Sequence, residues 1–269
     1  MDPTPAVVQS ALRAAADSPG YPQTTGAPAT RDAITSWVRR RLGARDGFDV
    51  LPTIGTKEFV AWLPTLLDLG AADRVVIPEL AYPTYDVGAR MAGAQVQVAD
   101  SLTVIGPARV SLLWLNSPSN PTGKVLPVDH MAKVVSWARE RGALVVSDEC
   151  YYELGWTEQP VSVLHPDVCG GDPTDVLALH SLSKRSNLAG YRFGFALGDP
   201  RVIDALLAAR KHTGFMVPTP VQHAAVAVLD DDTHVAEQCQ RYRARRQILL
   251  AALTGAGFRI DHSEAGLYL

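Results

Sequence analysis

The stretch Ala143-Leu144-Val145-Val146-Ser147-Asp148 decides the fold. Its continuous apolar run is typical of a β-strand that is covered on both faces, and such strands belong to mostly parallel sheets between layers of helices. Short strand patterns and helical patterns alternate on both sides of this stretch. The sequence therefore predicts an α/β protein with three α/β/α layers and a mostly parallel mixed sheet.

The other expected elements follow from hydrophobic periodicity and from Pro and Gly at helix ends. Strands are expected at residues 49–54, 74–78, 94–98, 110–115, 143–147, 176–180 and 191–197. Helices are expected at residues 5–16, 28–42, 55–69, 84–91, 128–141, 201–211, 220–229 and 232–253. A further strand is expected to begin at Phe258-Arg259-Ile260.

Composition excludes several classes of function. The net charge of -3 comes from 25 basic and 28 acidic residues spread along the chain, so no overall field recruits nucleic acid or an anionic membrane. The start has no basic and apolar leader pattern, and no apolar run is long enough to span a bilayer. The three cysteines lack the paired spacing of a zinc site or a disulfide framework. We expect a cytoplasmic protein without a metal.

Polar and aromatic side chains follow several predicted strands. In a parallel α/β sheet, ligands gather beyond the carboxyl ends of the strands. Gly55-Thr56-Lys57 opens a helix there, so its N–H groups suit a phosphate. Asn120 offers an amide from a Pro-containing loop, and Asp148 is a carboxylate whose burial is costly unless it meets a cation. Tyr82 could present a flat face to an aromatic ring, although a tyrosine in the core is the commoner outcome.

Lys184 lies in Ser181-Leu182-Ser183-Lys184 and precedes Arg192 by eight positions. A lysine amine with its ordinary pKa of ~10.4 is protonated at neutral pH, so a reactive lysine needs a partner that holds it as an imine. The two small hydroxyl residues and the arginine suit an aldehyde cofactor that carries a phosphate. Taken alone, the same stretch also fits an ordinary polar loop.

Together these residues form a set that one cofactor requires. The set holds an imine-forming lysine, an acid for a ring nitrogen, an amide, a phenol and a stacking ring. Its phosphate donors are Thr56, Ser181 and Arg192. Pyridoxal phosphate is the cofactor that needs this combination, because its ring accepts electrons only while its nitrogen stays protonated.

Three motifs resemble the class I/II aminotransferases of pyridoxal-phosphate fold type I, in the family's order and at similar spacing. They are Asn120-Pro121-Thr122-Gly123, Asp148-x-x-Tyr151, and Ser181-x-Ser183-Lys184 with Arg192. The resemblance implies that Lys184 forms the Schiff base, with Asp148 as the partner of the pyridine nitrogen and Asn120 and Tyr151 as donors to the ring hydroxyl. It further implies cofactor contacts from Tyr82 as the stacking ring and from Gly55, Thr56, Lys57, Ser181, Ser183 and Arg192 near the phosphate.

The resemblance also implies a homodimer with shared sites, because Tyr21 resembles the tyrosine that reaches the phosphate of the neighbouring subunit. Within the family, residues 20–26, 116–123 and 184–190 look most like N-succinyldiaminopimelate aminotransferases of the actinobacterial type. That likeness implies exchange of an amino group between N-succinyl-L,L-2,6-diaminopimelate and 2-oxoglutarate, a step of lysine biosynthesis. The alternatives are another aminotransferase of the aspartate or aromatic type, a carbon–sulfur β-lyase, and a noncatalytic cofactor-binding fragment.

The family's domain plan implies three parts of this chain. Residues 1–17 would form a helix bordering a small domain, 18–232 the large cofactor-binding domain, and 233–269 a connecting helix and the start of the small domain. The N-terminal substrate loop and the arginine that grips the substrate carboxylate are expected to be missing, so the chain is expected to be truncated at both ends. Weak cofactor binding or slow turnover would follow, since that grip fixes the reacting Cα–H bond.

Overall fold

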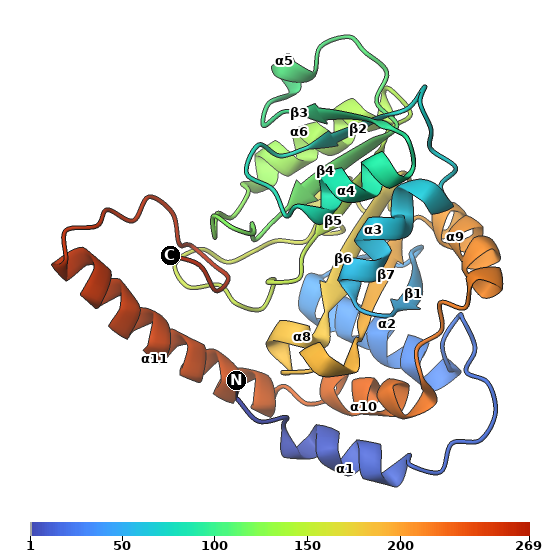
Figure 1. The fold of residues 1–269 in the computed structure, drawn as a ribbon, viewed down its shortest axis with the longest axis vertical. Coiled ribbons are helices and arrows are strands. Elements are labelled where there is room, and N and C mark those ends of the chain that lie inside the picture. The colour runs from blue at the N-terminus through green and yellow to red at the C-terminus, as the bar shows by residue number, and fades with distance from the viewer. Residues whose placement is uncertain (1) are drawn as a thin grey trace.

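A seven-stranded mixed sheet forms the centre of the computed structural model, which describes residues 2–269 (Figure 1). The strands are β1 (Asp49–Thr53), β2 (Arg74–Ile77), β3 (Gln95–Val98), β4 (Leu112–Asn116), β5 (Leu144–Asp148), β6 (Val176–Ser181) and β7 (Gly194–Gly198). Their order across the sheet is β1-β7-β6-β5-β4-β2-β3. Strand β7 pairs antiparallel with both of its neighbours, β1 and β6, and the pairs among the other strands are parallel. The predicted α/β class and mostly parallel mixed sheet are therefore confirmed.

Helices cover both faces of the sheet. The long helices are α1 (Ala6–Ala14), α2 (Pro28–Leu42), α3 (Thr56–Leu66), α4 (Thr84–Met91), α6 (Val128–Arg139), α9 (Pro200–Thr213), α10 (Thr219–Leu229) and α11 (Thr233–Gly255). The short ones are α5 (Leu102–Ile105), α7 (Pro166–Cys169), α8 (Leu182–Arg185) and the 3-10 helix η1 (Ala189–Tyr191). One core cluster joins α2, α6 and α10 to the sheet, and the other joins α3, α4 and α9 to the opposite face.

Strand β5 shows why its sequence is apolar throughout. Leu144 and Val146 belong to the core under α3, α4 and α9, whereas Val145 belongs to the core under α2, α6 and α10. Successive side chains of a strand point to opposite faces, so both faces here require an apolar residue. Val145 and Val146 have no exposed surface, and each such burial stabilises the fold by about 1.5–3 kcal/mol.

Two predicted strands differ in the structure. The strand predicted at 191–197 begins only at Gly194, because Tyr191 ends η1 and Arg192 takes a left-handed backbone with φ 57°. The strand predicted from Phe258 is wrong: residues 258–260 have no ladder partner and follow α11 in an irregular path. Helix α11 leads away from the sheet (Figure 1), so this stretch lies far from any open strand edge.

Candidate active site

The ends of five strands bring the candidate residues to one edge of the sheet. Asn116 at the end of β4 lies opposite Asp148 at the end of β5, and Ser181 at the end of β6 lies opposite Gly194 at the start of β7. Thr53 at the end of β1 lies on the other side of Gly194. Because parallel strands end at the same edge, residues distant in the sequence become neighbours here.

Asp148 is a buried carboxylate with two hydrogen-bond donors and no basic partner. It is 7% exposed, and it accepts from the Tyr85 hydroxyl at 2.8 Å and from the Cys150 N–H at 3.2 Å. Within residues 2–269 no Lys, Arg or His forms an ion pair with it. Burying an unpaired carboxylate is costly, so the position suits a cationic group such as a protonated ring nitrogen.

Tyr85 is a site residue that the sequence reasoning missed. It lies on α4, and its ring stacks on Trp114 with centroids 4.7 Å apart. Burial raises the pKa of its phenol well above the ordinary value, so the hydroxyl stays protonated and donates to Asp148. The sequence held one signal, because Tyr85 follows the predicted site residue Tyr82 by three positions. In the structure the two rings meet edge to face, with centroids 5.8 Å apart.

Gly55 and Arg192 form a cradle suited to an anion. Gly55 has φ 71° and ψ 159°, and a Cβ there would lie 2.8 Å from Cζ of Arg192. The absence of a side chain therefore lets the guanidinium lie against the N-terminus of α3, where N–H groups also attract anions. Arg192 is held in place by a hydrogen bond from Nη1 to the carbonyl of Ala189 at 2.8 Å.

Thr56 and Ser181 lie beside the same cradle. A Cβ on Gly194 would lie 3.0 Å from the Thr56 nitrogen, and Ser181 is the β6 partner of Gly194. The structure thus brings together the three phosphate donors predicted from the sequence, Thr56, Ser181 and Arg192. A cradle that a Cβ would fill, rich in donors, fits a phosphate group.

Lys184 lies on α8, which directly follows β6. The Ser181 side chain caps this short helix by accepting from the N–H of Ser183 at 3.1 Å. Within residues 2–269 the Lys184 amine forms no ion pair, although its charge acts on the thiol of Cys150. Burial raises the pKa of that thiol well above its ordinary value. Cys150 also joins the cradle, since its Sγ lies 3.1 Å from Oγ1 of Thr56.

The predicted amide Asn120 is placed by a second amide, Asn116, which the sequence reasoning did not single out. The Asn120 N–H donates to Oδ1 of Asn116 at 2.7 Å, and Nδ2 of Asn116 donates to the carbonyl of Asp148 at 3.0 Å. Asn116 is buried at the end of β4. The loop that carries Asn120 is thus tied directly to the strand that carries Asp148.

Tyr151 meets another tyrosine from the far end of the chain. Its hydroxyl lies 2.7 Å from that of Tyr268, and burial raises its pKa above the ordinary value. No spacing in the sequence could predict this pair, because 117 positions separate the two residues.

Two other predicted site residues lie at the surface. Lys57 is exposed, and its Nζ lies 5.9 Å from the centroid of the Tyr82 ring. Tyr21 is 95% exposed.

A large hollow lies beside the loop that carries Asn120. It measures about 1040 Å³, and its wall includes Asn116 and Ser119 but neither Lys184 nor Asp148.

Within residues 2–269 there is no cluster of three His, Cys, Asp or Glu side chains that could hold a metal ion. None of the helices in that range has the length and apolar character needed to cross a membrane.

Known proteins resemble this chain in sequence and in fold. A family model described as aminotransferase class I and II matches residues 1–269. A probable aminotransferase of Mycobacterium tuberculosis is 60% identical over the whole chain, which spans 65% of that protein. The 4-dedimethylamino-4-oxo-anhydrotetracycline transaminase OxyQ of Streptomyces rimosus is 56% identical over the whole chain, which spans 75% of it.

A solved structure has the same fold at lower identity. The structure of N-succinyldiaminopimelate aminotransferase from Mycobacterium tuberculosis superposes with a TM-score of 0.87 at 27% sequence identity. The match covers 98% of this chain and 73% of that one. The likeness therefore extends over nearly all of the sheet and helices described above.

Proposed function

The chain belongs to the class I and II aminotransferases, a family that depends on pyridoxal phosphate, and from this premise we propose that it transfers an amino group from an amino acid to an oxo compound. One observation carries the proposal. Cys150 joins the anion cradle of Gly55 and Arg192 to the unpaired buried carboxylate of Asp148, because its Sγ lies 3.1 Å from Oγ1 of Thr56 and its N–H donates to Asp148, and the charge of Lys184 acts on its thiol. A phosphate fits the first, and a protonated ring nitrogen fits the second.

Each side chain would have a separate role. Bound pyridoxal phosphate supplies an electron sink when the Cα–H bond of the substrate breaks. Lys184 would hold the cofactor covalently and, once the substrate has displaced it, would move the proton at Cα as base and then as acid. Asp148, oriented by Tyr85, would keep the ring nitrogen protonated. Thr56 and Arg192 would donate to the phosphate.

The remaining predicted contacts fit the same assignment. Tyr82 would lie against one face of the cofactor ring, and Asn120 and Tyr151 would donate to the ring hydroxyl. Ser181 and Ser183 would join the phosphate donors at the N-terminus of α8. Their hydrogen bond to each other supports a fixed geometry there.

For the substrate, we propose N-succinyl-L,L-2,6-diaminopimelate with 2-oxoglutarate as acceptor. The motifs at residues 20–26, 116–123 and 184–190 and the likeness to a solved N-succinyldiaminopimelate aminotransferase support this choice. A second candidate is amination of a ring ketone in a polycyclic compound. It is supported by the 56% identity to OxyQ, which exceeds the 27% identity to the former enzyme.

A panel of amino donors tests these assignments. The chain is loaded with pyridoxal phosphate and given 2-oxoglutarate with N-succinyl-diaminopimelate, aspartate or an aromatic amino acid, and glutamate is measured. We expect glutamate from the succinylated substrate and none from the matched Lys184→Arg variant. Glutamate formed only with another donor would reject the substrate. Release of pyruvate from cystathionine without transamination would reject the transaminase proposal in favour of a β-lyase.

We also propose that the chain acts as a cytoplasmic homodimer in which Tyr21 reaches the phosphate of the partner's site. The 95% exposure of Tyr21 in one subunit supports such a role. The proposed division into residues 1–17, 18–232 and 233–269 agrees with the start of α11 at Thr233. Light scattering that gives the mass of a single chain at micromolar concentration would reject the dimer.

A further inference from the structure

Three side chains on one face of α11 hold the segment that directly follows Lys184. His234 Nε2 lies 2.8 Å from the Ser186 hydroxyl, and Gln238 Oε1 accepts from Nδ2 of Asn187 at 3.0 Å. The Tyr242 hydroxyl donates to Oδ1 of Asn187 at 3.3 Å. The three α11 residues are spaced four positions apart, which places them on the same face of the helix.

The segment that they hold is rigidly joined to α8. Ser186 is fully buried, and its N–H donates to the carbonyl of Leu182 at 3.1 Å. Asn187 has a left-handed backbone with φ 53°, and the N–H of Leu188 returns to the carbonyl of Leu182. A shift of Ser186 or Asn187 would therefore move α8, which carries Lys184.

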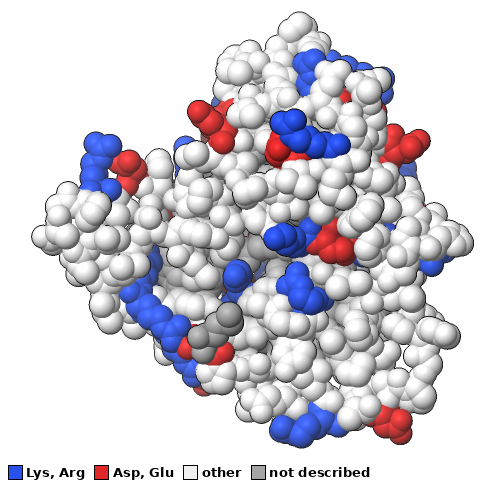
Figure 2. Space-filling view, viewed as in Figure 1, with Lys and Arg blue, Asp and Glu red and all other residues white. Residues whose placement is uncertain are grey.

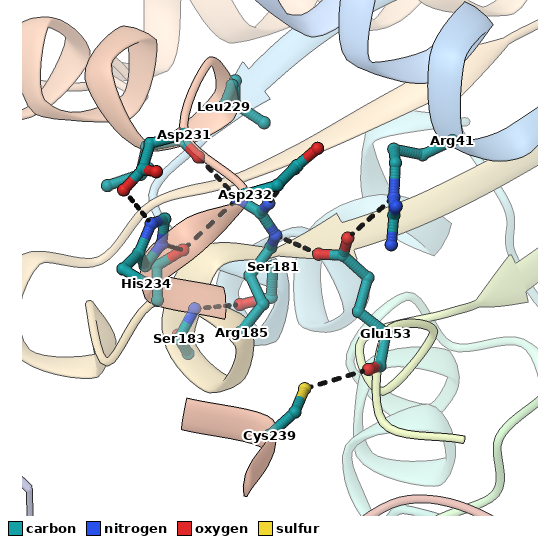
Figure 3. Close-up of polar contacts among 12 residues, drawn as sticks. Arg41, Glu153, Ser181, Ser183, Arg185, Leu229, Asp231, Asp232, His234 and Cys239 are labelled. Atoms are coloured by element: carbon teal, nitrogen blue, oxygen red, sulfur yellow. Dashed lines mark hydrogen bonds and ion pairs between the residues drawn. The ribbon is translucent and has the colours of Figure 1, made fainter. Parts of the chain in front are cut away.

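Arg185 anchors the other side of α8 (Figure 3). Its side chain is buried, it pairs with Glu153, and its Nη1 donates to the carbonyl of Val228 at 3.0 Å. Glu153 also pairs with Arg41 on α2 at 3.1 Å, and its carbonyl accepts from the thiol of Cys239 on α11 at 3.4 Å. Helix α8 is thus also fixed through Arg185, and α11 contacts this network through Cys239.

The amide of Gln238 is itself oriented by the N-terminal segment. Its Nε2 donates to Oδ2 of Asp2 at 2.7 Å, so its Oε1 faces Asn187. Asp2 in turn accepts from Nη1 of Arg245, another residue of α11, at 2.6 Å. Figure 2 shows basic side chains in a row along this helix. Both polar atoms of Gln238 are therefore used, and no apolar residue of equal size could replace it in this arrangement.

We propose that His234, Gln238 and Tyr242 are positioning residues, through which α11 sets the place of the Lys184 amine. The inference rests on the proposed function, in which that amine reacts with the cofactor aldehyde: a C=N bond replaces the C=O bond and one water leaves. The three residues act through Ser186 and Asn187 and would not themselves touch cofactor or substrate. They would therefore govern how fast Lys184 captures the aldehyde, and not how well the cofactor's ring and phosphate are held.

Two variants of the full chain test this with little change in volume. Gln238→Met removes the hydrogen bonds of Gln238 to Asn187 and Asp2, and Tyr242→Phe removes the bond of Tyr242 to Asn187. The matched control is Gln240→Met, the same replacement at an exposed position of α11. Capture of pyridoxal phosphate is followed by absorbance and by borohydride trapping on the Lys184 peptide. Affinity for pyridoxamine phosphate, which has no aldehyde, is measured by fluorescence.

We expect Gln238→Met to slow capture by roughly tenfold or more, since small misplacements of a reacting group are expensive, with Tyr242→Phe in the same direction. Affinity for pyridoxamine phosphate should match that of Gln240→Met. Capture at the wild-type rate in both variants would overturn the inference, as would a loss of pyridoxamine phosphate affinity equal to the loss of rate. A wild-type chain that traps nothing on Lys184 would instead reject the proposed function itself.

Discussion

Gly55→Ala tests the anion cradle through backbone geometry. With φ 71° and ψ 159°, Gly55 occupies a region that is essentially restricted to glycine. Any other residue there costs about 1–3 kcal/mol of folding free energy. In addition, the new Cβ would lie 2.8 Å from Cζ of Arg192, so the guanidinium must leave the cradle.

The loss of cofactor affinity follows from the displaced charge. A hydrogen bond to a charged group contributes about 1.5–3 kcal/mol, which corresponds to roughly 10–150-fold in the dissociation constant of pyridoxal phosphate. Pyridoxal lacks the phosphate, so its binding should change little. The preference of the protein for the phosphorylated form should therefore fall.

Gly106→Ala is the matched control. Gly106 has φ 71° and ψ −160°, which is the same region of backbone conformation as Gly55. Nothing lies within 4 Å of the point that an added Cβ would occupy there. Urea unfolding should show a similar loss of stability in both variants. Titration with pyridoxal phosphate, followed by absorbance, should show weaker binding only in Gly55→Ala. Equal affinity in the two variants would refute the assignment of Arg192 to the phosphate.

Three further outcomes are expected. Tyr85→Phe should lower the free energy of unfolding by about 1.5–3 kcal/mol in urea, because Asp148 loses a donor; a change below about 0.5 kcal/mol would contradict this. Burial lowers the pKa of His234 below 6.5, so the unfolded chain binds the proton more readily and the free energy of unfolding should fall as the pH drops below about 6.5. His234→Gln should reduce this loss of unfolding free energy at low pH, and an unchanged dependence on pH would exclude His234 as its cause. Tyr268→Phe should cost about 0.5–1.5 kcal/mol in thermal unfolding, since Tyr151 loses its partner, and a variant as stable as the wild type would argue against that bond.

Much of the fold was predictable because its signals are local. Helices α2 and α4 have the predicted bounds, 28–42 and 84–91, and Gly43 ends the former in a left-handed conformation as a C-terminal glycine should. The start of β7 was not predictable in this way. The apolar pattern continues through Tyr191, but the left-handed backbone of Arg192 turns the chain before the ladder begins.

The candidate site was predictable only at the strand ends. Asp148 ends a strand and Thr56 closely follows one, and the topology of the sheet then places them at one edge. Their partners depend on tertiary contacts that leave no spacing in the sequence. Tyr85 lies 63 positions from Asp148, and Gln238 lies 51 positions from Asn187. Such contacts require the packed positions of α4 and α11.

The most direct test of the account is covalent trapping at Lys184. The chain is incubated with pyridoxal phosphate, reduced with borohydride, digested and mapped by mass spectrometry, with Lys184→Arg as control. The account predicts a cofactor-derived mass on the peptide that contains Lys184 and none on that peptide in the variant. An unmodified Lys184 peptide from the wild-type chain, or the same adduct on other lysines only, would contradict it.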